Sequence, residues 1–268
     1  MRFTKMESYG NDYVYITAAR SALRSPGMLA RFCADRRRGI GGDGMILITG
    51  SEKCDILMRV FNPDGSEAEM CGNALRSSAA LVYMKGLVCK EDITVETAGG
   101  VRSVRILACD GCRCLALSDL GAPQNVKKIE NAVAFEDGMK DALSLSLGNP
   151  HCVVFCKDVE NLDILRYGPA LEKSKHFPDG ANVHFCRADG GGIVCRSWER
   201  NCGETPSCAT GAAAAFFYAH KSGAAGKRAY VKHPGGELLA ELNGEGHILI
   251  TGETKLVFEG EFMPEAVE

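Results

Sequence analysis

Apolar and polar residues alternate along many short stretches of the chain, a period of two that is typical of β-strands with one buried face. In the first half these stretches are residues 13–16, 45–48, 56–61, 101–107 and 114–117. In the second half they are residues 143–147, 152–155, 182–186 and 193–198, followed by further strands from Tyr230 onward. Glycine, aspartate and asparagine separate the stretches, as turn residues do. The pattern predicts a protein that is mostly β-sheet.

A few segments carry the signals of helices instead. Ser25-Pro26 joins a capping residue to a proline suited to the first helical position, and it predicts a helix to about Arg36. Residues 162–174 contain a second predicted helix. Two more begin beside Cys71 and Cys208, where small residues and alanines follow each cysteine, and end near residues 86 and 223. Few helices among many strands predict the α+β class.

The stretch around Cys71 is repeated around Cys208, 137 residues later. The first copy contains Arg59, Phe61, Glu67 and Cys71, and the same spacing in the second copy holds Arg196, Trp198, Glu204 and Cys208. In each copy an aromatic strand leads through a polar turn into a cysteine. The repeat predicts two similar halves, residues 1–118 and 119–268, with a cleft between them. The last strand, about 254–268, is expected to cross back to the first half.

Composition narrows the kind of partner. A net charge of -3 and a pI near 6.1 provide no basic field for nucleic acid or a membrane surface, so a small molecule is the expected partner. No apolar run is long enough to span a bilayer. The start of the chain shows no signal segment, and the thirteen cysteines are an odd number. We therefore expect a cytoplasmic protein, with a homodimer as a possible assembly.

Two motifs suggest ligands that the surrounding sequence does not support. Residues 39–44 fit the dinucleotide pattern G-x-G-x-x-G, but they follow a predicted helix and precede a strand, the reverse of the required order. Cys109, Cys112 and Cys114 are close enough to suggest zinc, yet no second ligand pair is evident. A turn loop and a hairpin are the favoured interpretations, and no metal site is predicted.

The two repeated cysteines are the strongest candidates for chemistry. A helix N-terminus has unpaired N–H groups and a partial positive charge, so it lowers the pKa of a thiol and binds an anion such as a carboxylate. Two such ends facing one another would place one sulfur on each face of an α-carbon, as in a two-base racemase. The alternative is that each cysteine is a buried core thiol. His151, after a strand and a turn, and the pair Glu199-Arg200 gain interest beside the thiols.

These residues together resemble the diaminopimelate epimerase family, which interconverts LL- and meso-diaminopimelate without a cofactor. The resemblance is carried by Gly10-Asn11-Asp12-Tyr13, Gly39-Ile40-Gly41, Phe61-Asn62-Pro63-Asp64-Gly65-Ser66-Glu67, Cys71-Gly72-Asn73-Ala74, Gly148-Asn149-Pro150-His151, Asn182-Val183, Trp198-Glu199-Arg200, Gly203-Glu204-Thr205 and Cys208-Ala209-Thr210-Gly211. The motifs occur in order along most of the chain, which makes the resemblance specific.

The resemblance implies two pseudo-symmetric halves, each a mostly antiparallel sheet or barrel around a central helix. It implies that Cys71 and Cys208 are the acid/base thiols and that His151 and Glu199 assist them. Substrate recognition would fall to Asn11, Asn62, Asn149, Asn182, Glu199 and Arg200, and the α-carboxylate would bind the backbone at Gly72, Asn73, Ala209 and Thr210. No cofactor and no metal are implied. The product would feed lysine and peptidoglycan synthesis.

Some positions depart from the usual pattern of the family. Ser8-Tyr9 precedes Gly10, where glycine commonly stands at position 8; position 44 is glycine, and Ala209 replaces a common glycine. Several alternatives stay open: a racemase or epimerase of the same fold acting on another amino acid such as lanthionine or histidine, a fold relative that isomerises without paired thiols, and a thiol-redox or metal-binding protein.

Overall fold

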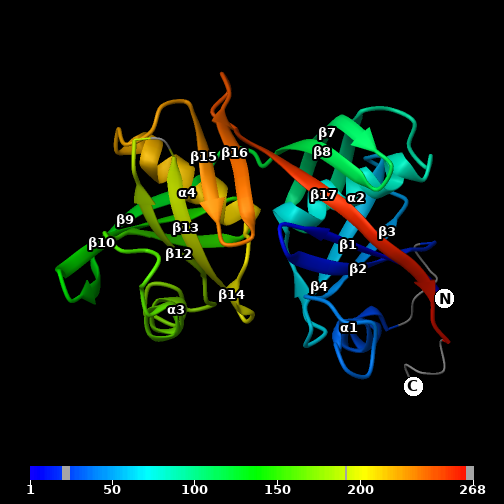
Figure 1. Cartoon of the computed structure of the whole chain (residues 1–268), viewed down its shortest axis with the longest axis horizontal. Coiled ribbons are helices and arrows are strands. Elements are labelled where there is room, and N and C mark those ends of the chain that lie inside the picture. Colours follow the sequence, from blue (N-terminus) through cyan, green and yellow to red (C-terminus); the bar gives the residue numbers. More distant parts are fainter. Residues whose placement is uncertain (20–24, 191, 264–268) are drawn as a thin grey trace. The chain divides into compact units, whose positions relative to one another are not determined.

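The computed structural model describes residues 1–19, 25–190 and 192–263, and Figure 1 shows the course of the chain. Its residues cluster into two units, Met1–Ser118 with Gly252–Glu268 and Asp119–Thr251. Within the described ranges, we find no helix with the length and apolar character needed to traverse a lipid bilayer.

The first unit is a mixed sheet around one helix. Its strands are β1 (Arg2–Ser8), β2 (Asn11–Thr17), β3 (Met45–Thr49), β4 (Ile56–Phe61), β5 (Glu67–Ala68), β6 (Asp92–Thr97), β7 (Gly100–Asp110) and β8 (Arg113–Asp119), with β17 (Ile248–Glu261) entering from the second unit. β2 pairs with β3 and β4 with β6 in parallel, while β1–β2, β3–β4 and β6–β7 are antiparallel. Because β17 pairs with both β1 and β8, the sheet closes on itself.

The central helix of this unit is α2 (Gly72–Met84), which Figure 1 shows in cyan among the strands. Every residue from Gly72 to Val82 is buried. A helix that is buried all round needs small or apolar side chains on every face, and the alanines and serines of this segment meet that need. A shorter helix, α1 (Pro26–Ala34), packs outside β2, β3 and β4.

The second unit has the same plan. Its strands are β9 (Gln124–Phe135), β10 (Gly138–Ser146), β11 (Pro150–Phe155), β12 (Asn182–Ala188), β13 (Ile193–Glu199), β14 (Gly203–Thr205), β15 (Arg228–His233) and β16 (Gly236–Leu242), and its helices are α3 (Ile164–Glu172) and α4 (Ala209–Lys221). β11 pairs with β12 and β13 with β15 in parallel, and the remaining pairs are antiparallel. α4 contacts β11, β12, β13, β15 and β16.

The sequence repeat is also a repeat of strand register. Val14 lies opposite Met45 in the β2–β3 pair, and His151 lies opposite Asn182 in the β11–β12 pair, so both members of the pair shift by the same 137 residues. Arg59 forms an ion pair with Glu67, and Arg196 forms one with Glu204. These equivalent pairs join the two strands before each cysteine, β4 to β5 and β13 to β14.

The predicted elements can be compared with the observed ones. α1 starts at Pro26 as predicted and ends two residues early, at Ala34, and Ser25 makes no side-chain capping hydrogen bond. The pattern missed β1, β6 and β9. In β1 the polar residues Thr4 and Lys5 are buried, which hides the alternation, and β9 is largely exposed, so it has little apolar pattern to detect.

The glycines of residues 39–44 serve close packing of the backbone. A Cβ on Gly39 would lie 1.7 Å from the carbonyl oxygen of Phe32, and one on Gly44 would lie 2.2 Å from that of Phe61. Gly44 also has φ +155°, a conformation that side chains disfavour. The departure at position 44 is thus explained by a backbone that has no room for a side chain.

The cysteine-rich turn lies between β7 and β8, as the hairpin interpretation predicted. Cys109 and Cys114 form a disulfide there, a pairing that the sequence did not predict, and Cys112 is free and exposed. Within the described part of the chain, no cluster of histidine, cysteine and carboxylate side chains could hold a metal ion.

Candidate active site

Cys71 stands at the N-cap of α2, directly before the first helical residue. Its backbone is extended (φ -137°, ψ 118°), and its carbonyl accepts the first helical hydrogen bond from Leu75 at 2.9 Å. The thiol is half-buried and donates to Oδ1 of Asn11, with Sγ and Oδ1 3.7 Å apart. Two predicted site residues, one from β2 and one from the helix start, are therefore brought together.

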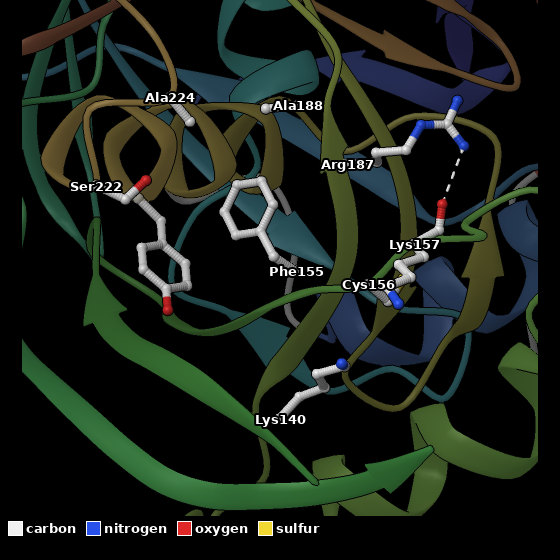
Figure 2. A pocket seen from close by; sticks show the side chains of 9 residues that line it. Lys140, Phe155, Cys156, Lys157, Arg187, Ala188, Ser222 and Ala224 are labelled. Atoms are coloured by element: carbon white, nitrogen blue, oxygen red, sulfur yellow. Dashed lines mark hydrogen bonds between the residues drawn. The ribbon is translucent and has the colours of Figure 1, made fainter. Parts of the chain in front are cut away.

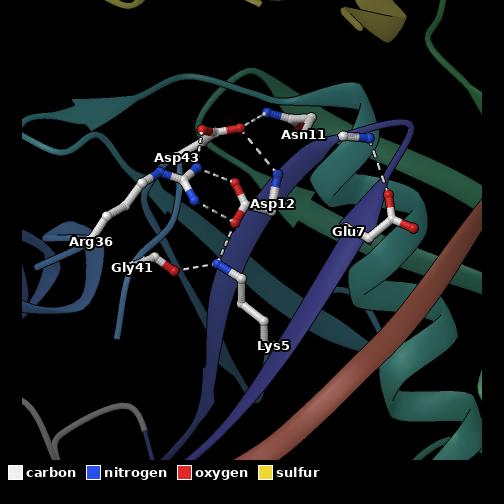
Figure 3. A network of polar contacts seen from close by, with 8 residues as sticks. Lys5, Glu7, Asn11, Asp12, Arg36, Gly41 and Asp43 are labelled. Carbon is white, nitrogen blue, oxygen red and sulfur yellow. Dashed lines mark hydrogen bonds and ion pairs between the residues drawn. The ribbon is translucent and has the colours of Figure 1, made fainter. Parts of the chain in front are cut away.

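Asn11 is held in this orientation by Asp43, as Figure 3 shows. Its amide Nδ2 donates to Oδ2 of Asp43 at 2.9 Å, which turns Oδ1 toward Cys71. The same Asp43 oxygen accepts from the backbone N–H of Asp12 at 3.1 Å. The carboxylate therefore fixes both the side chain and the strand that carries it.

A four-membered charge network surrounds Asp43. Arg36 donates to both oxygens of Asp12 and to Asp43, and Lys5 forms an ion pair with Asp12 at 2.5 Å. Burial opposes the charge on Asp12, but hydrogen bonds from Arg36 and Lys5 outweigh it, so the pKa of Asp12 is lowered. Burial and the charge of Asp12 raise the pKa of Asp43. Two cations thus balance two carboxylates beside Asn11.

The other predicted residues of this unit occupy two places. Asn73 is buried in the first turn of α2, and its Oδ1 accepts from Nη2 of Arg76 at 2.6 Å. Asn62 lies in the turn after β4, where its Nδ2 donates to Oγ of Ser66 at 3.0 Å. Gly72 begins α2, so its N–H belongs to the first turn, where the helix leaves donors without intrahelical partners.

Cys208 holds the corresponding position in the second unit. It is the N-cap of α4, with φ -128° and ψ 108°, and the residue is buried with 4% of its surface exposed. Its Sγ lies 3.5 Å from Oγ1 of Thr210, in the first turn of the helix. Ala209 is the first residue of the helix, so its N–H, like that of Gly72, belongs to the first turn.

A continuous chain of polar contacts leads from Cys208 into the core of this unit. Asn149 Nδ2 lies 3.4 Å from Thr210 Oγ1, and its Oδ1 lies 2.8 Å from Nε2 of His151. His151 Nδ1 lies 2.9 Å from Nε2 of His184, whose Nδ1 lies 2.9 Å from the hydroxyl of Ser197. Three predicted residues, Asn149, His151 and Thr210, belong to this chain with Cys208.

The hydrogen-bond partners fix the tautomers of the two histidines. The amide oxygen of Asn149 can only accept, so His151 donates from Nε2 and accepts at Nδ1. His184 then donates from Nε2 and accepts the Ser197 hydroxyl at Nδ1. Burial lowers the pKa of His151 to about 3, aided by the charge of Arg200, and burial lowers the pKa of His184 well below its usual value. Both rings are uncharged at neutral pH.

The remaining predicted residues lie around the ends of β12 and β13. Asn182 Nδ2 donates to the carbonyl of Pro150 at 2.9 Å, and its Oδ1 accepts from the backbone N–H of Arg200 at 3.1 Å. Glu199 Oε1 accepts from the hydroxyl of Thr205 at 2.5 Å. Asn182 therefore joins the strand of His151 to the turn that carries Arg200.

Comparison with known proteins identifies the family. The family model described as diaminopimelate epimerase matches residues 3–126 and 143–257. The chain belongs to the diaminopimelate epimerase family. The predicted family and its enzyme class, an isomerase, are confirmed.

Relatives named diaminopimelate epimerase extend over nearly the whole chain. The one from Methanococcus maripaludis (strain C5) is 37% identical, covering 97% of this chain and 99% of that relative. Those from Desulfovibrio desulfuricans and Desulforudis audaxviator are 39% and 40% identical, each covering 98% of this chain and 98% and 99% of their own lengths.

Solved structures of lower sequence identity share the fold. A hydroxyproline epimerase from Agrobacterium vitis aligns with a TM-score of 0.77 at 17% identity, covering 99% of this chain and 93% of its own. A predicted epimerase from Pseudomonas aeruginosa aligns with a TM-score of 0.74 at 15% identity, covering 98% of this chain and 99% of its own. The predicted α+β fold of this epimerase family is confirmed.

Several residues that contact the predicted epimerase site were missed in the sequence. They are Lys5, Ser8, Arg36, Asp43, Arg76, His184, Ser197 and Thr205. A signal existed for Asp43 and His184, because each is a polar residue within or beside a predicted buried strand. Arg76 had a weaker signal, a single charge in a helix whose other faces are small or apolar.

A hollow of about 530 Å³ on the second unit lies apart from these contacts (Figure 2). Its lining includes Phe155, Tyr218, Lys140, Lys157 and Arg187, and none of the predicted site residues lines it. Arg187 pairs with Glu160 at 2.6 Å, and Lys140 and Lys157 both pair with Asp137. The cationic rim is therefore already compensated, which argues against an anion site.

Proposed function

We propose that this protein epimerises LL-2,6-diaminopimelate to meso-diaminopimelate with its two thiols as acid and base. The main support is the combination of near-full-length relatives named diaminopimelate epimerase with a cysteine at the N-cap of the central helix in both units. The repeated ion pairs before each cysteine support the equivalence of the two positions.

The reaction needs only proton transfer. One cysteine, as thiolate, takes the α-proton, and the electron pair left on the α-carbon is delocalised into the carboxylate. The other cysteine, as thiol, gives a proton to the opposite face, so the inverted product leaves the two thiols with exchanged roles. The N–H groups of the helix starts, at Gly72, Asn73, Ala209 and Thr210, hold the carboxylate and stabilise the charge that develops on it.

The surrounding polar residues position substrate and thiols. Asn11 supports Cys71, and Thr210 and Asn149 support Cys208. His151 assists as a neutral hydrogen-bonding group, because its pKa of about 3 keeps it uncharged at pH 7. Glu199 binds the α-amino group, and Asn62, Asn182 and Arg200 recognise the distal end of the substrate. No metal or cofactor takes part in this proposal.

The wider setting follows from the same assignment. The substrate is a small amino acid, and the product serves lysine and peptidoglycan synthesis. We also propose a cytoplasmic location and a homodimer, with the sequence character and the family resemblance as their support.

The test is exchange of the α-proton for deuterium in heavy water, without pyridoxal phosphate. Diaminopimelate should exchange with inversion, whereas histidine, proline and lanthionine in parallel tubes should not. Exchange of another amino acid alone would move the substrate and keep the mechanism.

The two thiols should prove individually essential. Cys71→Ala and Cys208→Ala should each lower epimerisation by at least about 10³-fold, as loss of an acid/base group does. Cys112→Ala, in the exposed turn of the first unit, is the matched control and should retain full activity. Normal epimerisation by either of the first two variants, folded as judged by circular dichroism, would contradict the two-thiol mechanism.

A further inference from the structure

Arg76 is a fully buried arginine in the second turn of α2, with 0% of its surface exposed. Its Nη2 donates to Oδ1 of Asn73 at 2.6 Å and to Oγ of Ser8 at 3.0 Å, and its Nη1 lies 3.3 Å from the carbonyl oxygen of Gly72. Its Nε is buried without a hydrogen-bond partner. All three acceptors are neutral, although a buried guanidinium is costly unless an anion compensates it.

The groups whose charges act on Arg76 are Cys71, Tyr9 and Tyr15. None of the ion pairs found among the described residues provides it with a carboxylate, and burial lowers its pKa only to about 10, so it is protonated at neutral pH. Burial raises the pKa of Tyr15 far above its usual value, and this hydroxyl stays neutral. A thiol ionises closer to neutral pH than a phenol does, which favours Cys71 over Tyr9 as the compensating anion.

We propose that Arg76 is a positioning residue whose buried charge holds Cys71 as the thiolate before substrate binds. The charge acts from inside the same helix whose N-terminus carries the thiol, so its effect adds to that of the helix end. The proposal rests on the proposed function only for its catalytic consequence, the choice of which thiol starts as the base.

The other charged groups near Cys71 leave this role to Arg76. Asp12 and Asp43 are compensated by Lys5 and Arg36, and this network contacts the thiol only through the neutral amide of Asn11. Tyr9 accepts a hydrogen bond from the backbone N–H of Glu253 at 2.9 Å. Arg76 is thus the buried cation without a carboxylate partner in this part of the described structure.

The second unit lacks this cation inside its helix. The position equivalent to Arg76, 137 residues later, is Ala213, and the first charged or titratable residue of α4 is His220 near its C-terminus. The bases that lead to Cys208, His151 and His184, are neutral because burial lowers their pKa values. Arg200, which acts on His151, is only half-buried, so solvent screens its charge more strongly. The two thiols therefore differ in their fixed electrostatic surroundings.

The test is the pH dependence of alkylation of each thiol by iodoacetamide, which reacts with the thiolate. Protein without substrate is treated briefly from pH 5 to 10, and peptide mass spectrometry gives the rate at Cys71 and at Cys208 separately. The midpoint, rather than the rate, is compared because the buried Cys208 reacts more slowly. In the wild-type protein the Cys71 midpoint should lie at least about one pH unit below that of Cys208.

Variants then assign the difference to the buried charge. Arg76→Gln should raise the Cys71 midpoint by about one pH unit or more and leave that of Cys208 in place. Arg76→Lys keeps a cation and should keep the Cys71 midpoint near that of the wild type. Arg105→Gln removes an exposed arginine paired with Asp92 in the same unit, and it should change neither midpoint.

A folded Arg76→Gln protein with an unchanged Cys71 midpoint would overturn the proposal. If that variant does not fold, the wild-type comparison decides, because a Cys71 midpoint equal to or above that of Cys208 also overturns it. Alkylation requires no substrate. A protein that fails to exchange diaminopimelate but shows the shifted thiol would therefore contradict the proposed function and leave the role of Arg76 intact.

Discussion

Individual residues show that the repeat preserves geometry more closely than electrostatics. Cys71 and Cys208 have similar backbone angles at similar helix starts. Beside the first stands a buried, protonated arginine, and the second connects through Thr210 and Asn149 to two neutral histidines. The shared backbone provides N–H donors to both units, while the side chains make the two environments different.

The second unit carries a third buried histidine, His233, which is 3% exposed and whose ring nitrogens have no hydrogen-bond partner in the described structure. Burial lowers its pKa to about 4. Below its ordinary value of about 6.5 the unfolded chain binds a proton that the folded protein excludes, so stability falls as the pH drops from about 6.5 toward 4.

We expect His233→Leu to remove this contribution. Between pH 6.5 and 4.5, the free energy of unfolding should fall less steeply in the variant than in the wild type, by about 1.4 kcal/mol per pH unit. Urea denaturation at each pH gives the slopes. His176→Leu, outside this buried group, is the control and should leave the slope unchanged; equal slopes for wild type and His233→Leu would refute the expectation.

At the scale of elements, the start of α4 and the strand β12 are fitted to one another. A Cβ on Gly211 would lie 2.3 Å from Cε1 and 2.5 Å from Nδ1 of His184. The absence of a side chain at Gly211 thus lets the histidine ring pack against the first turn of the helix. The motif Cys208-Ala209-Thr210-Gly211 needs its glycine for this contact.

Gly211→Ala should therefore displace either the helix start or His184. We expect a loss of stability of about 1–3 kcal/mol, as for overpacking of a core, together with reduced activity because His184 orients His151. Chemical denaturation and the deuterium-exchange assay measure the two effects. Gly226→Ala, where an added Cβ meets nothing within 4 Å, is the control and should be nearly silent. An equally silent Gly211→Ala would show that the packing is not limiting.

For the molecule as a whole, the repeated arginine–glutamate pair measures how far the two units have diverged. Arg59 pairs with Glu67, and its side chain is 37% exposed. Arg196 pairs with Glu204, is 18% exposed, and also donates to the carbonyls of Val159, Glu160 and Leu162. The second arginine thus organises a loop in addition to the strand pair.

Removal of these arginines should have unequal effects. Arg59→Gln should destabilise its unit by no more than about 1 kcal/mol, as for a partly exposed pair. Arg196→Gln should cost about 2–3 kcal/mol, because three buried or half-buried carbonyls lose a charged donor. Urea denaturation curves of the two variants measure the difference. Equal losses would mean that the carbonyl contacts add nothing.

The sequence by itself determined the helix starts, most of the strands, the repeat and the family, because these depend on local spacing and on residue types that only certain turns and caps accept. It also predicted Asn11, Asn149, His151 and Thr210, which contact a thiol or its hydrogen-bond chain in the structure. It could not predict β1 and β9, whose patterns are blurred by buried polar residues and by exposure.

Only the tertiary structure decided which groups surround each thiol. Asp43 meets Asn11 across 32 residues, Arg76 meets Ser8 across 68, and His184 meets His151 across 33, through strand pairing and helix burial. Burial then sets their charge: it leaves His151 and His184 neutral and Arg76 protonated without a carboxylate partner in the described structure. The physical reason is that solvation and long-range contacts are properties of the folded packing, whereas the spacing of residues is local.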